Sequence, residues 1–362
     1  MNILHLEYSG GTGGIEKLCK DIALNAKEDK HCFLFVHEGG RFFDEMQKES
    51  LDVQCLKFGN KDIVRLYSAV KKTVQEKKID AIIIHHPAPL IWLSMLLYLS
   101  LPHTARVLVY AHNVYEVITV QNKFKRVIYN KLLAKCDGVV AISEFVKDTF
   151  LSNAPLTDKK VCVIYNGIEC PDECTISDGT LHDPLRIIYV GRLIEEKGVQ
   201  VLLKALSLIK EKVPFETQIV GDGPYRPTLE ALKKDLKLEE SVQFCGNQSN
   251  VNERLQQADL FIHPCVWNEA FGLTIAEALS YGKICIATRR GAIPEIIQDG
   301  ENGFLVDSEN PEMMAEKIEY VYKTMTEEQR LKIRQNAVLR AQDFKIENLI
   351  SQLHDYISSL KQ

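Results

Sequence analysis

Short β-rich runs alternate with segments of helical periodicity along almost the whole chain. In the first half, six runs rich in apolar and β-branched residues are expected to be strands, at residues 2–8, 31–37, 81–85, 106–112, 138–142 and 160–165. Helical segments such as 14–25, 63–77 and 124–134 lie between them. This alternation is typical of a parallel sheet with helices on both faces, so residues 1–168 are expected to form a doubly wound α/β domain.

The alternation restarts after an irregular stretch at residues 169–184, which contains two prolines, a glycine and several acids and is interpreted as an interdomain linker. Six further strands are expected, at residues 185–190, 215–220, 242–245, 260–263, 284–287 and 303–305. Residues 185–345 are therefore expected to form a second doubly wound domain, and a helical stretch at 346–362 is expected to pack back on the first. Ligands bind outside the carboxyl ends of such strands, so a cleft between two Rossmann-like domains is the expected active site.

Charge and cysteine usage exclude several classes of protein. The 44 Lys and Arg residues against 49 Asp and Glu give a net charge of -5, so no nucleic-acid partner is expected. Ten cysteines are spread along the chain, and the closest pair, Cys170 and Cys174, has neither the spacing of a zinc knuckle nor that of a redox motif. We expect reduced cysteines and no metal site.

Two sequence features bear on location. The N-terminus lacks the basic and long apolar regions of a secretory signal. The most apolar run, residues 89–101, is shorter than the roughly 18 to 20 residues of a membrane-spanning helix, and is expected to be a buried helix. A cytoplasmic protein is the expectation.

A glycine-rich loop links the first strand to the first helix, with glycines at 10, 11, 13 and 14. Backbone amides at such a loop can approach an anion, which suggests a phosphate loop, but glycines also make tight turns there. The spacing matches neither the dinucleotide fingerprint nor a P-loop.

Two cations follow the first strand of the second domain. Arg192 comes directly after the strand and Lys197 precedes the next helix. A planar guanidinium and a mobile ammonium group together suit a diphosphate and the charge that grows on it as a bond breaks. The alternative is a pair of solvated surface cations.

The densest polar cluster lies at residues 263–278, where the order is strand, loop and helix. Glu269 is expected in the loop and Glu277 early in the helix, too far apart in sequence to suggest a glycosidase pair. They are better suited to contact two parts of one elongated ligand, with the amides of residues 271–274 as anion-binding groups. The alternative is a loop charge and a carboxylate favoured by the helix dipole.

Histidines end two strands of the first domain. His112 is a candidate active-site residue, although a buried structural histidine would look the same in sequence. His85 and His86 form a second pair, which we interpret as structural because no carboxylate or cysteine partner stands at ligand spacing.

A basic segment lies between Glu116 and Asp137, with no acid inside it and with apolar residues interleaved. This composition suits an anionic membrane surface or a solvated helix face. The basic residues are Lys123, Lys125, Arg126, Lys131 and Lys135.

The stretch E-A-F-G-L-T-I-A-E at residues 269–277 resembles the E-x7-E signature of the retaining glycosyltransferases of family 4, also called group 1, which have the GT-B fold. Further stretches match the same family in the same order: the glycine loop, N-G-I at 166–168, G-R-L-I-E-E-K-G at 191–198, I-V-G-D-G-P at 219–224, and two motifs within 291–306. The resemblance covers nearly the whole chain.

The resemblance implies a role for each matching residue. Gly13 and Gly14 would approach the sugar donor, Arg192 and Lys197 would bind its diphosphate, and Glu277 would hold the ribose. Glu269 would face hydroxyls of the transferred sugar and His112 would lie near sugar and acceptor; these two, with Arg192 and Lys197, are the expected catalytic residues. The remaining contacts expected with the sugar donor come from Phe271, Gly272, Leu273, Thr274 and, at the nucleobase, Asn247 and Gln248.

The resemblance also implies a metal-independent, retaining transfer without a cofactor, from a nucleotide sugar to a glycan or a lipid-linked saccharide. A UDP-linked hexose or N-acetylhexosamine is the first expectation and GDP-mannose the second. An epimerase or phosphorylase of the same fold is the nearest rival. An NAD-dependent oxidoreductase is disfavoured by the glycine spacing, and a non-catalytic sugar-binding protein would be expected to lack Arg192, Lys197, Glu269 and Glu277, which are all present.

Overall fold

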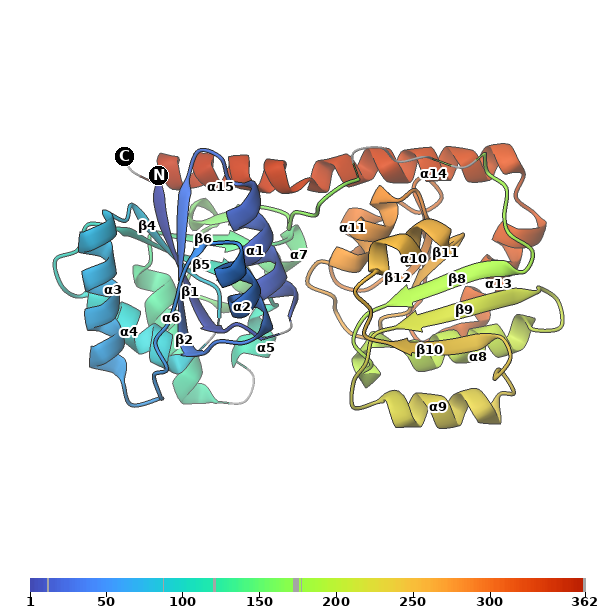
Figure 1. Ribbon diagram of the computed structural model, residues 1–362, viewed down its shortest axis with the longest axis horizontal. Helices are drawn as coiled ribbons and strands as arrows, with labels where there is room; N and C mark the ends of the chain where they lie inside the picture. The colour runs from blue at the N-terminus through green and yellow to red at the C-terminus, as the bar shows by residue number, and fades with distance from the viewer. Residues whose placement is uncertain (12, 87, 120–121, 172–175, 177, 361–362) are drawn as a thin grey trace. The chain divides into compact units, whose positions relative to one another are not determined.

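The structure is a computed structural model that describes residues 1–11, 13–86, 88–119, 122–171, 176 and 178–360. Its contacts divide the described residues into two units. The first comprises those of Met1–Ile168 and Ile346–Gln362, and the second those of Glu169–Lys345. Each unit is a parallel sheet with helices on both faces (Figure 1).

The sheet of the first unit has the strand order β3-β2-β1-β4-β5-β6-β7. All its paired strands are parallel. The strands are β1 (Asn2–Ser9), β2 (Lys30–Glu38), β3 (Asp52–Cys55), β4 (Ala81–Ile84), β5 (Arg106–Ala111), β6 (Gly138–Ala141) and β7 (Val161–Val163).

Strand β3 is absent from the sequence expectation, which was wrong to give this sheet six strands. Its four residues alternate between exposed and half-buried and contain one β-branched residue, Val53. A short edge strand covers little apolar surface, so its sequence carries a weak signal.

Helices α1 (Gly14–Asn25), α2 (Arg41–Lys48) and α15 (Ile346–Ser359) pack together, with α1 contacting both others. A second group packs together through α4 and α6. It comprises α3 (Ile63–Lys77), α4 (Pro89–Leu99), α5 (Tyr115–Thr119), α6 (Lys123–Lys135) and α7 (Glu144–Asn153).

Helix α4 contains most of the apolar run and is buried, as expected. Ile91, Trp92 and Met95 are at most 1% exposed, and α4 packs against both α3 and α6. Among the described residues, no helix has both the length and the apolar character that crossing a membrane demands.

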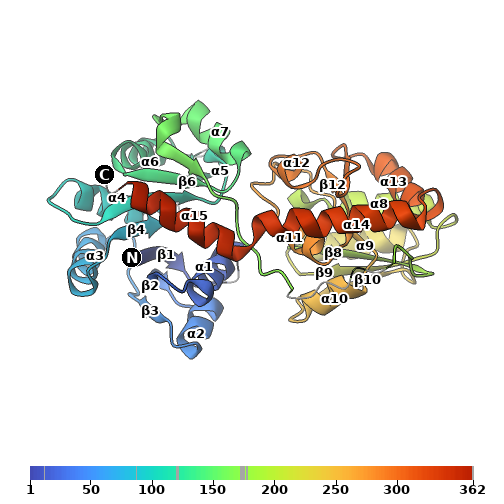
Figure 2. The ribbon, with the colours of Figure 1, turned by 90° about the horizontal axis from the view of Figure 1, so that it is seen from above.

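Helix α15 joins the last residues to the first unit. The N-terminal ammonium group donates to Asp29 Oδ1 at 2.5 Å, and His354 Nδ1 lies 2.9 Å from Asp29 Oδ2. Tyr356 donates its hydroxyl to the carbonyl of Lys160 at 3.0 Å. These bonds connect α15 to the residues directly before β2 and β7, and Asp29 also links α15 to the N-terminus. Figure 2 shows α15 lying across this unit.

The sheet of the second unit has the order β10-β9-β8-β11-β12-β13. Its strands are β8 (Leu185–Val190), β9 (Phe215–Val220), β10 (Val242–Gly246), β11 (Leu260–His263), β12 (Ile284–Thr288) and β13 (Phe304–Val306). Helices α8 (Val199–Ile209) and α13 (Pro311–Lys323) pack against each other, and so do α11 (Leu273–Ser280) and α14 (Glu327–Ala341) (Figure 2). The remaining helices are α9 (Arg226–Asp235), α10 (Val251–Gln257) and α12 (Ile293–Ile296).

Candidate active site

The clearest charged cluster of the second unit lies beyond the carboxyl ends of β8 and β11. These strands are neighbours in the sheet, so the loops that follow them meet. The β8 loop supplies Lys197, at the end of the 3₁₀ turn Glu195–Lys197, and the β11 loop supplies Glu269. Lys197 donates to Glu269 Oε2 at 2.5 Å, and His263 Nε2 lies 3.4 Å from the same oxygen.

Burial and pairing oppose each other at this cluster, and pairing decides the charge states. Burial alone raises the pKa of Glu269, but Lys197 and His263 hold that pKa well below its ordinary value. Burial alone lowers the pKa of Lys197, but Glu269 raises it above its ordinary value. In the unfolded chain the pKa is about 4.3 for Glu and about 10.4 for Lys, and between these values both groups of the folded pair are charged. The stability that the pair contributes is therefore lost only at lower pH, where Glu269 takes up a proton, or at higher pH, where Lys197 loses one.

Two glycines allow the loops to approach closely enough for this pair to form. Gly198 has φ +74°, and a Cβ there would lie 1.9 Å from the carbonyl oxygen of Pro264. Gly291 has φ +56°, and its Cβ would lie 2.2 Å from the carbonyl oxygen of Glu269. The glycines of the predicted motifs thus place Lys197 and Glu269 through backbone packing.

Helix α11 begins at Leu273, directly after Gly272 with φ +112°. The amides expected at residues 271–274 therefore lie at a helix start. Phe271 is buried against Phe344, with ring centroids 5.5 Å apart, and fixes the position of this turn. Glu277 is half-buried in the second turn of α11, later in the helix than the sequence predicts.

The remaining predicted residues of this unit differ in their surroundings. Arg192 is exposed, and its carbonyl accepts a hydrogen bond from Tyr189 at 3.1 Å. Asn247 is exposed, whereas Gln248 donates to the Cys245 carbonyl and accepts from Arg254 Nη2 at 3.0 Å. The sequence reasoning missed Arg254, which belongs to α10 and reaches this loop only through the fold.

The first unit places Gly13 and Gly14 at the start of α1 and His112 directly after β5. Glu16 lies in the first turn of α1, and a Cβ on Gly13 would lie 2.3 Å from its Oε2. The helix start therefore already has a carboxylate beside it. His112 is 8% exposed and stacks on Tyr110, with centroids 4.5 Å apart.

His85 and His86 have no carboxylate or cysteine partner at ligand spacing in the sequence, but the fold brings both kinds of partner to them. His86 Nδ1 lies 2.6 Å from Glu7 Oε2, and Cys19 Sγ lies 3.6 Å from His85 Nδ1. Cys19 donates to Glu7 Oε1 at 2.8 Å. Sequence spacing could not show this, because β1, α1 and the end of β4 each contribute one part of the cluster.

Among the described residues, two groups bring three potential metal ligands together, although the sequence suggested none. In the first group, His5 Nδ1 and His85 Nε2 lie 2.8 Å apart, a hydrogen-bond distance and less than the roughly 3.3 Å that separates two nitrogens on one tetrahedral zinc ion. In the second group, His263, Cys265 and Glu269, the carboxylate already pairs with Lys197. Cys174, considered beside Cys170 in the sequence, lies outside the described residues.

Helix α6 presents the predicted basic residues to solvent. Phe124 and Val127 are 70% and 52% exposed on the same helix, while Ile128 and Leu132 are buried against the rest of the unit. The helix therefore has a basic outer surface with two exposed apolar side chains. Its exposed basic residues are Lys123, Lys125, Arg126, Lys131 and Lys135.

Comparison with known proteins places this geometry in one family. The profile described as glycosyl transferases group 1 matches residues 176–340, and that of glycosyltransferase family 4 matches residues 12–170. A crystal structure of a glycosyltransferase from Rickettsia africae has a TM-score of 0.83 at 23% identity, and the match covers 100% of this chain and 98% of that one. The fold is therefore GT-B.

Two curated relatives match over shorter segments. N-acetyl-alpha-D-glucosaminyl L-malate synthase of Bacillus anthracis is 39% identical over 121 residues, 33% of this chain and 32% of that protein. The gpi3 component of phosphatidylinositol N-acetylglucosaminyltransferase from Schizosaccharomyces pombe is 28% identical over 178 residues, 47% of this chain and 39% of that protein. The chain thus spans between about a third and two fifths of the length of these relatives.

Proposed function

The chain belongs to the family 4, or group 1, glycosyltransferases, and from that membership we propose that it is a retaining enzyme that transfers a hexosyl or N-acetylhexosaminyl group from a nucleotide diphosphate sugar. The second unit binds the nucleotide sugar, and the first unit binds the acceptor, a glycan or a lipid-linked saccharide. A UDP-sugar is our first choice, and the names of both curated relatives support N-acetylglucosamine as the sugar.

The observation that carries this proposal is the paired Lys197 and Glu269 beside the start of α11, with Arg192 exposed on the same loop as Lys197. Arg192 and Lys197 bind the diphosphate, and their charges stabilise the negative charge that develops as the sugar-oxygen bond breaks. Glu269 orients the Lys197 ammonium group and accepts hydrogen bonds from sugar hydroxyls. The first amides of α11 add donors toward an anion.

The remaining contacts divide between the ends of the sugar donor. Glu277 accepts from the ribose hydroxyls, and the loop that holds Asn247 and Gln248 contacts the nucleobase. Arg254 holds Gln248 in place for that contact. In the first unit, the carboxylate of Glu16 beside Gly13 makes the glycine loop better suited to neutral hydroxyls than to a phosphate.

A transfer assay with UDP-glucose, UDP-N-acetylglucosamine and GDP-mannose tests the proposal. With a suitable saccharide acceptor, we expect nucleoside diphosphate release with one sugar and a product whose anomeric configuration, read by NMR, matches that of the sugar donor. Activity with GDP-mannose alone would make the chain a mannosyltransferase. Conversion of a nucleotide sugar to its epimer without an acceptor would replace the proposal with an epimerase.

Transfer is expected to need no metal ion, because the cations Arg192 and Lys197 and the start of α11 supply the positive charge that a divalent ion supplies elsewhere. The rate in excess EDTA should stay within about twofold of the untreated rate. Activity that disappears on chelation and returns only with magnesium or manganese would contradict this expectation.

The α6 surface supports a second element of the proposal, docking on an anionic membrane that carries the acceptor. Each basic residue near such a surface contributes about 1 kcal/mol, and the attraction weakens with salt. The exposed Phe124 and Val127 can enter the headgroup region while the basic side chains contact the lipid phosphates. The enzyme is accordingly expected on the cytoplasmic face of the membrane.

Changing the five basic residues of α6 to Gln should abolish sedimentation with phosphatidylglycerol vesicles at low salt and leave nucleotide binding intact. The matched control changes five exposed lysines elsewhere in the same unit, Lys27, Lys48, Lys61, Lys71 and Lys72, and should still sediment. Equal loss in both variants would show that the attraction is one of general charge and not of α6.

A further inference from the structure

Four histidines form a row across adjacent strands of the first unit. His31 lies on β2 and His5 on β1, while His85 and His112 directly follow β4 and β5. These strands are neighbours in the order β2-β1-β4-β5. The row advances diagonally: His31 pairs in register with Ile3, two residues before His5, and the same two-residue step recurs at each strand. Steps of two keep all four side chains on one face of the sheet.

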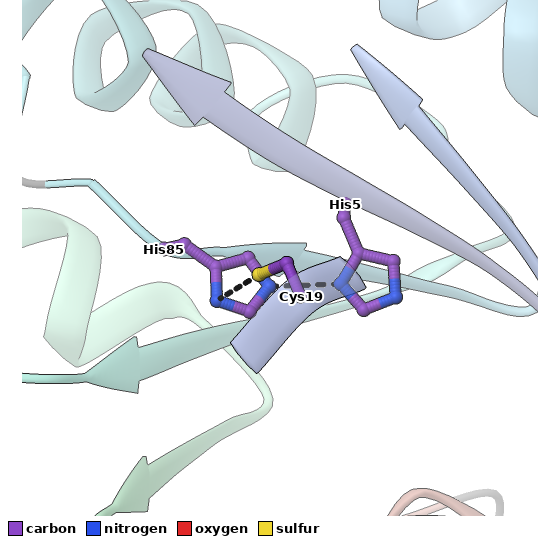
Figure 3. A group of neighbouring side chains, drawn as sticks. All are labelled: His5, Cys19 and His85. Atoms are coloured by element: carbon purple, nitrogen blue, oxygen red, sulfur yellow. Dashed lines mark hydrogen bonds between the residues drawn. The ribbon is translucent and has the colours of Figure 1, made fainter. Parts of the chain in front are cut away.

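The four rings are joined head to tail by hydrogen bonds. His31 Nδ1 lies 2.8 Å from His5 Nε2, His5 Nδ1 lies 2.8 Å from His85 Nε2, and His85 Nδ1 lies 2.9 Å from His112 Nε2. Figure 3 shows one ring nitrogen of His85 joined to the Cys19 sulfur and the other joined to His5. Every contact in the row thus joins an Nδ1 to an Nε2.

Neutral imidazoles have one N–H each, so the row has only two consistent arrangements. In one, every Nδ1–H donates toward His112; in the other, every Nε2–H donates toward His31. Burial lowers the pKa of all four rings, to about 3 for His112 and about 4 for His31, so they are neutral at physiological pH.

Two independent observations favour the first arrangement. His31 Nε2 is buried without a hydrogen-bond partner, and a proton there would leave an unpaired buried N–H. At His85, Glu7 Oε1 lies 3.9 Å from Nδ1, and this carboxylate favours a proton on that nitrogen. Cys19 donates its S–H to this same Glu7 oxygen, so the oxygen is a hydrogen-bond acceptor where it faces His85.

We propose that His31, His5 and His85 act as positioning residues that fix the tautomer of His112, with its Nε2 accepting from His85 and its proton on Nδ1. His112 then presents a hydrogen-bond donor, not a base, toward a ligand at the carboxyl end of β5. The part of this inference that concerns catalysis rests on the proposed function, since there the Nδ1–H would hold a sugar hydroxyl; the tautomer itself does not depend on it.

Long-range ¹H–¹⁵N NMR spectra of protein labelled with ¹⁵N-histidine test the tautomer directly, because protonated and unprotonated ring nitrogens differ in chemical shift. For wild-type protein we expect Nδ1–H signals for His5, His85 and His112. Nε2–H signals for these residues would overturn the proposal, whether or not the protein transfers sugar.

Substitution of His85 separates positioning from packing. The His85→Asn variant places an amide N–H where Nδ1 stood, and we expect His112 to keep its Nδ1–H tautomer and kcat to stay within about fivefold of wild type. The His85→Leu variant removes the bond; we expect a mixture of His112 tautomers and a drop in kcat of at least tenfold beyond His85→Asn. Thermal unfolding of both variants checks that they fold.

His103→Asn is the matched control, because His103 is exposed in the same unit and its Nδ1 lies at hydrogen-bond distance from the nearby Leu101 carbonyl, away from the row. It should change neither the His112 spectrum nor kcat. Equal effects of His85→Asn and His85→Leu on the His112 spectrum would contradict the proposal. An Nδ1–H tautomer of His112 in a wild-type protein that transfers no sugar would contradict only the proposed function.

Discussion

A Lys197→Met variant is expected to transfer sugar about 10²- to 10³-fold more slowly than wild type, because it lacks the ammonium group that stabilises charge on the leaving diphosphate. It should also lose up to about 3 kcal/mol of stability, since Glu269 remains charged and largely buried without its partner at 2.5 Å. Single-turnover kinetics and denaturant unfolding measure the two effects.

The double variant Lys197→Met with Glu269→Gln separates catalysis from folding. Removing both charges should restore most of the lost stability and leave turnover low. Lys204→Met, the same substitution at an exposed position of α8, is the control and should behave as wild type. Recovery of turnover together with stability in the double variant would assign Lys197 a structural role only.

A Gly198→Ala variant is expected to lose both stability, by at least about 3 kcal/mol, and nearly all activity. Its φ of +74° disfavours any side chain, and the new Cβ would lie 1.9 Å from the Pro264 carbonyl oxygen, so the loop that holds Lys197 must move away from Glu269.

Gly300→Ala isolates the backbone term of this effect, because Gly300 has a similar φ of +79° but no atom within 4 Å of an added Cβ. It should cost about 1 to 2 kcal/mol and leave activity intact. Equal losses of stability in the two variants would show that the close approach to Pro264 contributes nothing.

The position of Arg192, Lys197 and Glu269 in the fold was predictable from sequence, because all three lie in loops that follow strands. They follow short apolar runs that are typical of buried parallel strands, and the glycines beside them mark close backbone approach. The neighbouring position of β8 and β11, which pairs Lys197 with Glu269, follows from the doubly wound topology.

The histidine row could not be predicted in the same way. Its members are separated by 26, 80 and 27 positions in sequence, and their contact depends on strand order and on the two-residue offset of each pairing. No local pattern encodes that offset. Arg254 and Cys19 were missed for the same reason, since each reaches its partner from a helix through tertiary packing.

The central claim, that Arg192 and Lys197 bind the diphosphate of a nucleotide sugar, is tested most directly by calorimetric titration with UDP, GDP and ADP and with the matching nucleosides. For one of the three nucleobases, wild-type protein should bind the nucleoside diphosphate about 100-fold more tightly than the matching nucleoside, because two charge-assisted hydrogen bonds hold the diphosphate. In the Arg192→Gln, Lys197→Met double variant this ratio should fall below about tenfold. A full ratio in the double variant, or no preference for any diphosphate in wild type, would contradict the claim.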